Sequence, residues 1–184
     1  MTYELNIAGL KRQLPMCHVN DDLMIAGFVI FGDVELTVAC AAELIKIMPE
    51  FDYMVVPEAK AIPLAHEIAR QMGINDYFVV RKAQKLHMNG VFETEVRSIT
   101  TANVQKLYMD GADAAKLKDK RVLILDDVIS TGESLAAVET LVKKAGGNVV
   151  AKIAILAEGD AAQRYDIKFL EKLPLFDGNG NPLD

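Results

Sequence analysis

The sequence predicts one α/β domain, residues 1–184, with a mostly parallel central sheet flanked by helices. Apolar runs without alternation, such as residues 122–125, are typical of strands that are covered on both faces of a parallel sheet. Such runs alternate along the chain with segments of helical periodicity, which is the order found in α/β domains. A length of 184 residues fits a single domain, and no linker, internal repeat or low-complexity segment divides the chain.

Composition and charge disfavour several classes of function. The 51% hydrophobic and 25% charged residues are ordinary for a globular protein, and the net charge of -6 argues against a nucleic-acid partner. The longest apolar run, residues 24–31, is far short of the roughly 20 residues that cross a bilayer, and no signal-peptide pattern is present. We therefore expect a cytoplasmic protein without a membrane partner. Cys17 and Cys40 are far apart, and the sequence has no Cys-x-x-Cys motif and no clustered His, so we expect neither a zinc site nor a disulfide. We expect both thiols to be buried.

The first half of the chain is predicted to begin with a helix. Residues 4–14 show a weak helical pattern that ends at Pro15, and residues 23–31 read as a strand. Asp33 can cap a helix that runs to about residue 48. The elements predicted next are a buried strand at 53–56, a helix at 63–72 that stops at Gly73, and a strand at 77–81.

The second half is predicted to hold a flexible flap and the last strands of the sheet. Residues 81–90 are basic and weakly apolar, which is typical of a mobile loop. Extended segments at 92–98 and 104–108 predict an antiparallel pair, so that the flap spans about residues 82–110. The remaining predicted elements are a strand at 121–125, a helix at 135–145, a strand at 149–156, an extended edge piece at 167–175 and a turn at 177–180 near a loose end.

Residues 121–134 combine a strand, two acids, a polar turn and the start of a helix. Asp126 and Asp127 are predicted to end the strand, and the hydroxyl-rich loop of residues 130–134 leads into the helix. A helix start offers unpaired backbone N–H groups and partial positive charge, so this loop can hold a phosphate, and Gly132 lets the backbone approach closely. The alternative is that the acids merely end a strand and that Ser130 or Thr131 merely caps a helix.

The acids and the phosphate loop together require a ligand that separates them. At an effective dielectric constant of about 20, two like charges about 5 Å apart repel by roughly 3 kcal/mol, which is too much to leave uncompensated. A sugar with two hydroxyls for the carboxylates, a 5′-phosphate for the loop and a nearby divalent cation satisfies all of these demands.

This stretch resembles the phosphoribosyl-pyrophosphate (PRPP) signature of the type I phosphoribosyltransferases, with Glu133 where the adenine enzymes have a second glycine. Residues 57–61 are similar to the Glu-Ala-Arg-Gly loop of the adenine enzymes, with Lys60 for the arginine and Ala61 for the glycine. Arg81-Lys82 matches the Arg-Lys of the adenine and xanthine enzymes. Lysine keeps the positive charge of arginine but cannot donate two parallel hydrogen bonds. The replacement of arginine by Lys60 is therefore expected to affect the affinity for diphosphate. An isolated lysine is more simply a solvated charge, but positions after successive strands favour a ligand.

The N-terminal region, about residues 1–33, resembles the hood that covers the base in the adenine enzymes, with Gly32 where the family has arginine. The alternative is that Phe28 and Phe31 belong to the core. The flap is closer to that of the xanthine enzymes and purine-sensing repressors, and it lacks the Tyr-x-x-Glu pattern of the adenine enzymes, so we assign no general acid. The flap residues behind this likeness are Val96, Ser98, Thr100 and Gln105.

The resemblance implies an enzyme that transfers 5-phosphoribosyl from PRPP to a purine base and releases diphosphate, with Mg²⁺ held mainly through PRPP. It implies that Asp126 and Asp127 are catalytic, holding the ribose hydroxyls and stabilising positive charge on the sugar ring. The other implied contacts are Ser130, Thr131, Gly132, Glu133 and Ser134 to the 5′-phosphate, Ala59, Lys60, Arg81 and Lys82 to the diphosphate, and Ile30, Phe31, Val128 and Ile129 to the base.

The hood and the loop at residues 57–61 favour adenine, with AMP as the product of a purine salvage reaction, whereas the flap leaves xanthine or another oxopurine as the alternative. The alternative from another class of function is a PRPP-sensing regulator that binds the ligand without catalysis. Such repressors resemble this domain but carry a DNA-binding module, and we expect no residues left over for one. The family implies a homodimer.

Overall fold

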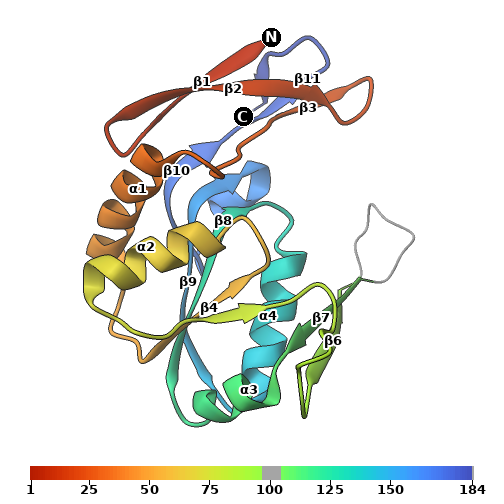
Figure 1. Cartoon of the computed structure of the whole chain (residues 1–184). Helices are drawn as coiled ribbons and strands as arrows, with labels where there is room; N and C mark the ends of the chain where they lie inside the picture. The colour runs from red at the N-terminus through yellow and green to blue at the C-terminus, as the bar shows by residue number, and fades with distance from the viewer. Residues whose placement is uncertain (97–104, 184) are drawn as a thin grey trace.

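A computed structural model describes residues 1–96 and 105–183, which are organised around two five-stranded sheets and one two-stranded sheet (Figure 1). The central sheet has the strand order β10-β9-β8-β4-β5, and each neighbouring pair is parallel. Its strands are β4 (Tyr53–Pro57), β5 (Phe78–Val80), β8 (Arg121–Ile129), β9 (Asn148–Glu158) and β10 (Lys168–Leu173). The predicted α/β fold with a parallel sheet is therefore confirmed.

Helices cover both faces of the central sheet. Alternate residues of β8 point to opposite faces: Leu123 and Leu125 pack in one core cluster with residues of α1 and α2, and Val122 and Ile124 in another with residues of α3 and α4. All four side chains are fully buried, as the unbroken apolar run predicts. The helices are α1 (Val34–Ile47), α2 (Ile62–Met72), α3 (Gly111–Leu117) and α4 (Glu133–Lys144).

The helix ends follow the local signals in the sequence. The Asp33 carboxylate accepts a hydrogen bond from the Leu36 backbone N–H at 3.0 Å, as a capping residue does. Gly73 ends α2 with a φ of 70°, which favours glycine. Helix α3 was not predicted, because its seven residues are too few to show a clear period. Its start did carry a signal, since the Asp110 side chain accepts a hydrogen bond from the Ala112 N–H at 2.9 Å.

The N-terminal region is an antiparallel sheet, so the helix predicted over residues 4–14 was wrong. Burial alternates with period two in β1 (Thr2–Ile7), where Leu5 and Ile7 are buried and Glu4 and Asn6 are exposed. Ala8 and Gly9 have φ values of 49° and 78° and form the tight turn into β2 (Leu10–His18). The strand predicted over residues 23–31 is shorter, and β3 spans Leu23–Ala26. Tertiary pairing therefore outweighs the weak helical spacing.

The C-terminal segment completes this sheet, so the predicted loose end was wrong. Strand β11 (Leu175–Asp177) pairs with β3, and β12 (Pro182–Leu183) pairs with β11. The Asp177 carboxylate closes the turn between them by accepting hydrogen bonds from the N–H groups of Asn179 and Asn181 at 2.9 and 2.8 Å. We call β1, β2, β3, β11 and β12 the hood sheet. Cys17 is exposed on β2, contrary to prediction, whereas Cys40 is buried.

The flap contains the predicted antiparallel pair, β6 (Phe92–Val96) and β7 (Gln105–Met109), which lies beside α4 (Figure 1). Its base joins the loop after β5, because the backbones of Arg81 and Tyr108 exchange two hydrogen bonds of 2.8 Å. Ser98 and Thr100, which support the flap resemblance, lie outside the described residues. Within the described part of the chain, no helix is long and apolar enough to cross a membrane.

Arg12 ties the hood sheet to the first helix of the core. Its Nε lies 2.6 Å from Oδ2 of Asp33, and its Nη2 lies 2.7 Å from Oε2 of Glu35. The hydrogen bond from Arg12 is the main cause that lowers the pKa of Asp33. One arginine therefore neutralises the capping residue of α1 and fixes the position of β2 against it.

Replacing Arg12 with Met is expected to lower the melting temperature by a few degrees at pH 7, because Asp33 and Glu35 lose their shared partner. The matched control is Lys11→Met on the same strand, where the ion pair with Glu4 is more exposed, and its melting temperature should stay nearly unchanged. Equal shifts in the two variants, measured by calorimetry, would contradict the role given to Arg12.

Candidate functional site

Most of the predicted site residues meet at the carboxyl ends of β4 and β8. A cavity of about 290 Å³ lies there, and a smaller one of about 110 Å³ shares Asp126, Val128 and Ser134 with it. The larger cavity is lined by Pro57, Glu58, Ala59, Lys60, Lys82, Leu107, Asp126, Asp127, Val128 and Ser134. The smaller cavity adds Ile129, Ser130, Thr131, Gly132 and Leu135. Parallel strands therefore bring together loops that are about 70 residues apart in sequence.

The two acids lie within β8, which runs on to Ile129, so the prediction that they end the strand was wrong. Pairing with β9 continues past them, since Val128 is opposite Leu156 and Ile129 is opposite Ala157. Lys60 Nζ lies 2.9 Å from Asp127 Oδ2. This oxygen nevertheless lacks a well-directed hydrogen bond, alone among the buried side-chain polar atoms of the described residues. A buried carboxylate oxygen in this state is suited to accept a hydrogen bond from a ligand hydroxyl.

Asp126 is held next to a like charge. The Asp127 backbone N–H donates to Asp126 Oδ1 at 2.9 Å. Burial, followed by the charge of Asp127, raises the pKa of Asp126 well above its ordinary value of 3.8. The site therefore keeps two neighbouring carboxyl groups in a place where ionisation of both opposes folding.

Replacing Asp126 with Asn is expected to raise the melting temperature at pH 7. The pKa of Asp126 is higher in the folded than in the unfolded chain, so the wild type loses stability as the pH rises above the unfolded value of about 3.9. Below about pH 3 both states are protonated, and the difference between wild type and variant should vanish. Melting curves from pH 3 to pH 8 measure this. A variant that is less stable than the wild type at pH 7 would contradict the raised pKa.

The loop after β4 is tied to the loop after β5 by Glu58. Its carboxylate accepts a hydrogen bond from the Lys82 backbone N–H at 3.0 Å and one from Arg81 Nε at 3.2 Å. The hydrogen bond from Lys82 is the main cause that lowers the pKa of Glu58, so this carboxylate is ionised. Arg81 lines a neighbouring cavity. The structure therefore brings Ala59, Lys60 and Lys82 to the acids, and links Arg81 to them through Glu58.

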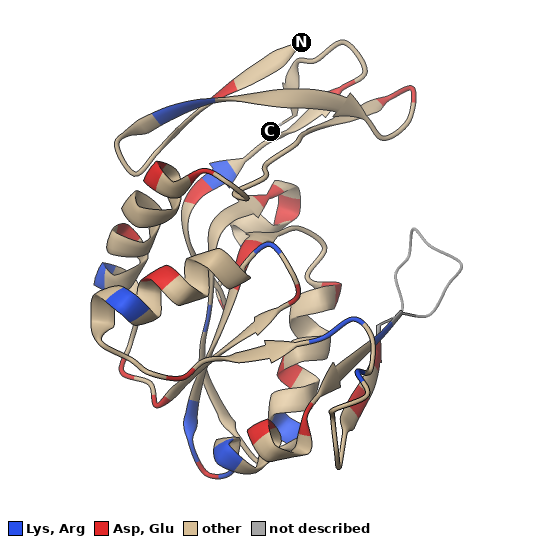
Figure 2. Ribbon diagram, in the orientation of Figure 1, with Lys and Arg blue, Asp and Glu red and all other residues tan. Residues whose placement is uncertain are grey.

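Charges of both signs gather around this place. Figure 2 shows Lys and Arg on the loops that follow β4 and β5, and Lys60 and Lys82 of these loops line the same cavity as Asp126 and Asp127. Within residues 1–96 and 105–183, no three His, Cys, Asp or Glu side chains are grouped so that they could hold a metal ion.

The polar loop at residues 130–134 is open to a ligand. Gly132, with a φ of 82°, precedes α4, and no side chain caps the helix there, so the alternative that Ser130 or Thr131 caps it was wrong. Ser130, Thr131 and Ser134 are exposed. The backbone N–H groups at the start of a twelve-residue helix, together with the nearby hydroxyls, can hold a phosphate.

Two residues that were not predicted reach this loop from the C-terminal segment. Glu158 ends β9, one position beyond the Ile129–Ala157 pair, so it lies beside Ser130. Burial raises the pKa of Glu158, and a hydrogen bond with Ser130 partly offsets this. Arg164 follows the 3₁₀ helix η1 (Gly159–Gln163) and approaches Gly132 so closely that a Cβ at Gly132 would collide with its Nη1. Only the pairing of β9 with β8 brings these residues to the loop.

The four residues implied in base binding lie in different environments. Val128 lines both cavities, and Phe31 is 50% exposed, so it is not a core residue. Phe28 is buried. Ile30 and Ile129 have 0% and 2% exposure and belong to the two core clusters. For Ile30 and Ile129, contact with the base stays a prediction.

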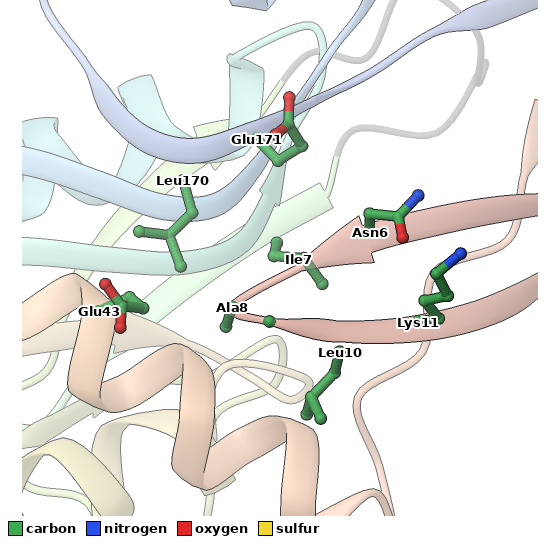
Figure 3. Close-up of a pocket in the computed structure, with 9 residues that line it drawn as sticks. Asn6, Ile7, Ala8, Leu10, Lys11, Glu43, Leu170 and Glu171 are labelled. Atoms are coloured by element: carbon green, nitrogen blue, oxygen red, sulfur yellow. The ribbon is translucent and has the colours of Figure 1, made fainter.

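A larger cavity lies elsewhere in the described part of the chain. It has a volume of about 570 Å³ and lies between the tip of the β1–β2 hairpin, α1 and β10 (Figure 3). Its charged lining includes Lys11, which pairs with Glu4, and Glu43, which pairs with Lys46. It contains none of the predicted site residues, so size alone does not identify the functional site.

Comparisons with known proteins cover most of the chain. The profile of the family described as phosphoribosyl transferase domain matches residues 41–177. The chain is 32% identical over 145 residues to a hypoxanthine/guanine phosphoribosyltransferase of Methanothermococcus okinawensis, covering 75% of each chain. It is 34% identical over 126 residues to an adenine phosphoribosyltransferase of Thermotoga petrophila, covering 66% of this chain and 71% of the relative.

Solved structures show the same fold. The crystal structure of adenine phosphoribosyltransferase from Saccharomyces cerevisiae, complexed with adenine and an imino-altritol bisphosphate, matches with a TM-score of 0.67 at 20% identity. The match covers 86% of this chain and 93% of that one. The Giardia lamblia enzyme complexed with 9-deazaadenine matches with a TM-score of 0.62 at 16% identity, covering 94% and 93%.

Proposed function

Because the chain belongs to the phosphoribosyl transferase domain family, in its purine branch, we propose that it transfers the 5-phosphoribosyl group of PRPP to a purine base, with adenine as the favoured base. The observation that carries the proposal is the meeting of the Asp126–Asp127 pair, the Lys60 ion pair and the open loop at residues 130–134 in two joined cavities. PRPP presents the matching groups: a diphosphate at one end for Lys60, ribose hydroxyls in the middle for the acids, and a 5′-phosphate at the other end for the loop.

In the proposed reaction, a ring nitrogen of the base forms a bond to C1′ of the ribose while the bond from C1′ to the diphosphate oxygen breaks. Positive charge grows on the sugar ring, and the carboxylates of Asp126 and Asp127 hold the 2′- and 3′-hydroxyls and stabilise that charge. The departing diphosphate takes the bonding electrons, and the ring proton of the base passes to the diphosphate or to water. Lys60 and Lys82 oppose the charge on the diphosphate, and Mg²⁺, when bound, adds to this neutralisation.

Lys60 is placed to change partners when PRPP binds. Its side chain is 44% exposed, whereas the Asp127 side chain that it pairs with is 4% exposed. The lysine therefore can move to the diphosphate, while the acid stays in place for the ribose. Leu107 of the flap lines the same cavity, so flap closure would exclude water from the reactive sugar.

The identity of the purine base is the more specific part of the proposal. The hood and the loop at residues 57–61 favour adenine, and the adenine-named relatives and structures support it. The hypoxanthine/guanine relative favours an oxopurine as the second candidate. A PRPP-sensing regulator remains the candidate from another class. We further propose that the protein works in the cytoplasm, as its sequence predicts, and as a homodimer, as the family resemblance implies.

Diphosphate release tests the proposal. Purified protein is incubated with PRPP, Mg²⁺ and one base at a time: adenine, hypoxanthine, guanine or xanthine. We expect the highest kcat/KM with adenine and no release without a base. Release with an oxopurine and not with adenine would correct the base. Release with none of them, together with PRPP binding by calorimetry, would favour the regulator.

A further inference from the structure

Arg164 contacts the phosphate loop from outside the PRPP signature. The residue follows η1, 32 positions after Gly132 in sequence. A Cβ built at Gly132 would collide with Nη1 and lie 3.4 Å from Cζ of Arg164, so the guanidinium packs directly on the loop backbone. Position 132 therefore favours glycine for two reasons: its φ is 82°, and Arg164 occupies the space in which a Cβ would lie.

A chain of ion pairs fixes the direction of this guanidinium. Nε and Nη2 of Arg164 donate to the two carboxylate oxygens of Asp166 at 3.0 and 2.9 Å. Asp166 in turn lies 2.5 Å from Lys152 Nζ, which lies 3.0 Å from Glu139 on α4. In the described part of the chain, Nη1 makes no hydrogen bond, and it is the nitrogen that faces Gly132. Asp166 therefore holds Nε and Nη2 of the Arg164 guanidinium, and the third nitrogen, Nη1, points toward the loop.

The loop lacks a cation of its own. Residues 126–134 contain three acids, Asp126, Asp127 and Glu133, and no Lys or Arg. A 5′-phosphate adds about two negative charges at neutral pH, which hydroxyls and backbone N–H groups alone would have to balance. Arg164 supplies a permanent positive charge next to the loop. Its side chain is 32% exposed, and a salt bridge at such a position adds little to stability by itself.

We propose that Arg164 is a positioning residue for 5′-phosphate binding: braced by Asp166, it holds the loop backbone at Gly132 and places positive charge behind the bound phosphate. This inference rests on the proposed function. Arg164 lines neither cavity of the site, so it acts through the loop rather than on the reacting atoms.

Calorimetric titrations with ribose 5-phosphate and with inorganic diphosphate test the proposal. Arg164→Gln is expected to weaken ribose 5-phosphate binding about tenfold and to leave diphosphate binding within about twofold of the wild type, because only the 5′-phosphate lies at this loop. Under turnover, the KM for PRPP should rise about tenfold while kcat and the KM for the base stay within about twofold. Arg164→Lys should restore part of the loss, since it keeps the charge but not the fork.

Arg121→Gln is the matched control, because Arg121 pairs with Asp52 and Glu50 at the opposite end of β8. It should lower the melting temperature without changing either binding constant. Unchanged ribose 5-phosphate binding in Arg164→Gln would overturn the proposal, as would equal weakening of both ligands, which a merely structural role predicts. A wild type that binds diphosphate or PRPP but no ribose 5-phosphate would overturn the Arg164 role alone. A wild type that binds none of them would overturn the proposed function with it.

Discussion

Asp127→Asn is expected to slow phosphoribosyl transfer at least about tenfold while the fold stays intact. The amide keeps the size of the side chain but removes the negative charge that opposes the positive charge on the ribose ring. A tenfold loss corresponds to about 1.4 kcal/mol of transition-state stabilisation, a modest share of what such buried electrostatic contacts supply. The partner left behind is the exposed head of Lys60, which water can solvate, so we expect little loss of stability.

Single-turnover kinetics with PRPP and adenine measure the chemical step in this variant. The matched control is Asp52→Asn, because Asp52 accepts a hydrogen bond from the Arg121 backbone N–H at 2.7 Å at the other end of β8. That change should affect stability and leave turnover unchanged. Full turnover in Asp127→Asn would refute the role of the acidic pair.

Gly132→Ala is expected to raise the KM for PRPP at least about tenfold. A left-handed backbone conformation costs a non-glycine residue about 1–2 kcal/mol, and here the methyl group would also displace the Arg164 guanidinium. The loop must shift to relieve both, and its N–H groups then no longer converge on the phosphate. Binding of ribose 5-phosphate by the variant measures the loss directly.

Gly73→Ala separates the backbone effect from the site effect. Gly73 has a φ of 70°, close to the 82° of Gly132, and a Cβ there would meet nothing within 4 Å. It ends α2, away from the two cavities of the site. This control should lose a similar amount of stability and keep the wild-type KM. A wild-type KM in Gly132→Ala would contradict the phosphate role of the loop.

The central sheet was predictable because its signals are local. Residues 122–125 are apolar without a break since helices cover both faces of β8. Asp33 marks a helix start through its side chain, which accepts from the Leu36 N–H, and Gly73 marks a helix end through its positive φ. The hood sheet was not predictable in this way. Its strand β3 pairs with β11, about 150 residues later, and the spacing of Leu5, Ala8 and Leu10 fits a helix until pairing with β2 selects period two.

The same difference between local and long-range signals applies to the candidate site. The acids and the hydroxyl loop form one continuous stretch of sequence, so their resemblance to the PRPP signature could be seen without the fold, although their spacing alone left a plain strand end and helix cap as the alternative. Glu158 and Arg164 carry no motif, and their nearness to the loop follows from the register of β9 on β8. The strand also continues through the acids to Ile129, because backbone pairing with β9 does not depend on the polar side chains.

The raised pKa of Asp126 indicates that the acidic pair lowers the stability of the fold. Two neighbouring carboxyl groups oppose folding, and Asn at position 126 is expected to relieve this at neutral pH. A chain that keeps both acids within a buried strand is therefore less stable at the point where the ribose is proposed to bind. This pattern is expected of a functional site rather than of a structural turn.

The most direct measurement is a crystal structure of the protein with PRPP and Mg²⁺. We expect the ribose hydroxyls within hydrogen-bonding distance of Asp126 and Asp127, the 5′-phosphate on the backbone of residues 130–134, and Lys60 moved from Asp127 to the diphosphate. Electron density for PRPP in another place, such as the larger cavity beside α1, with residues 126–134 empty, would contradict the account.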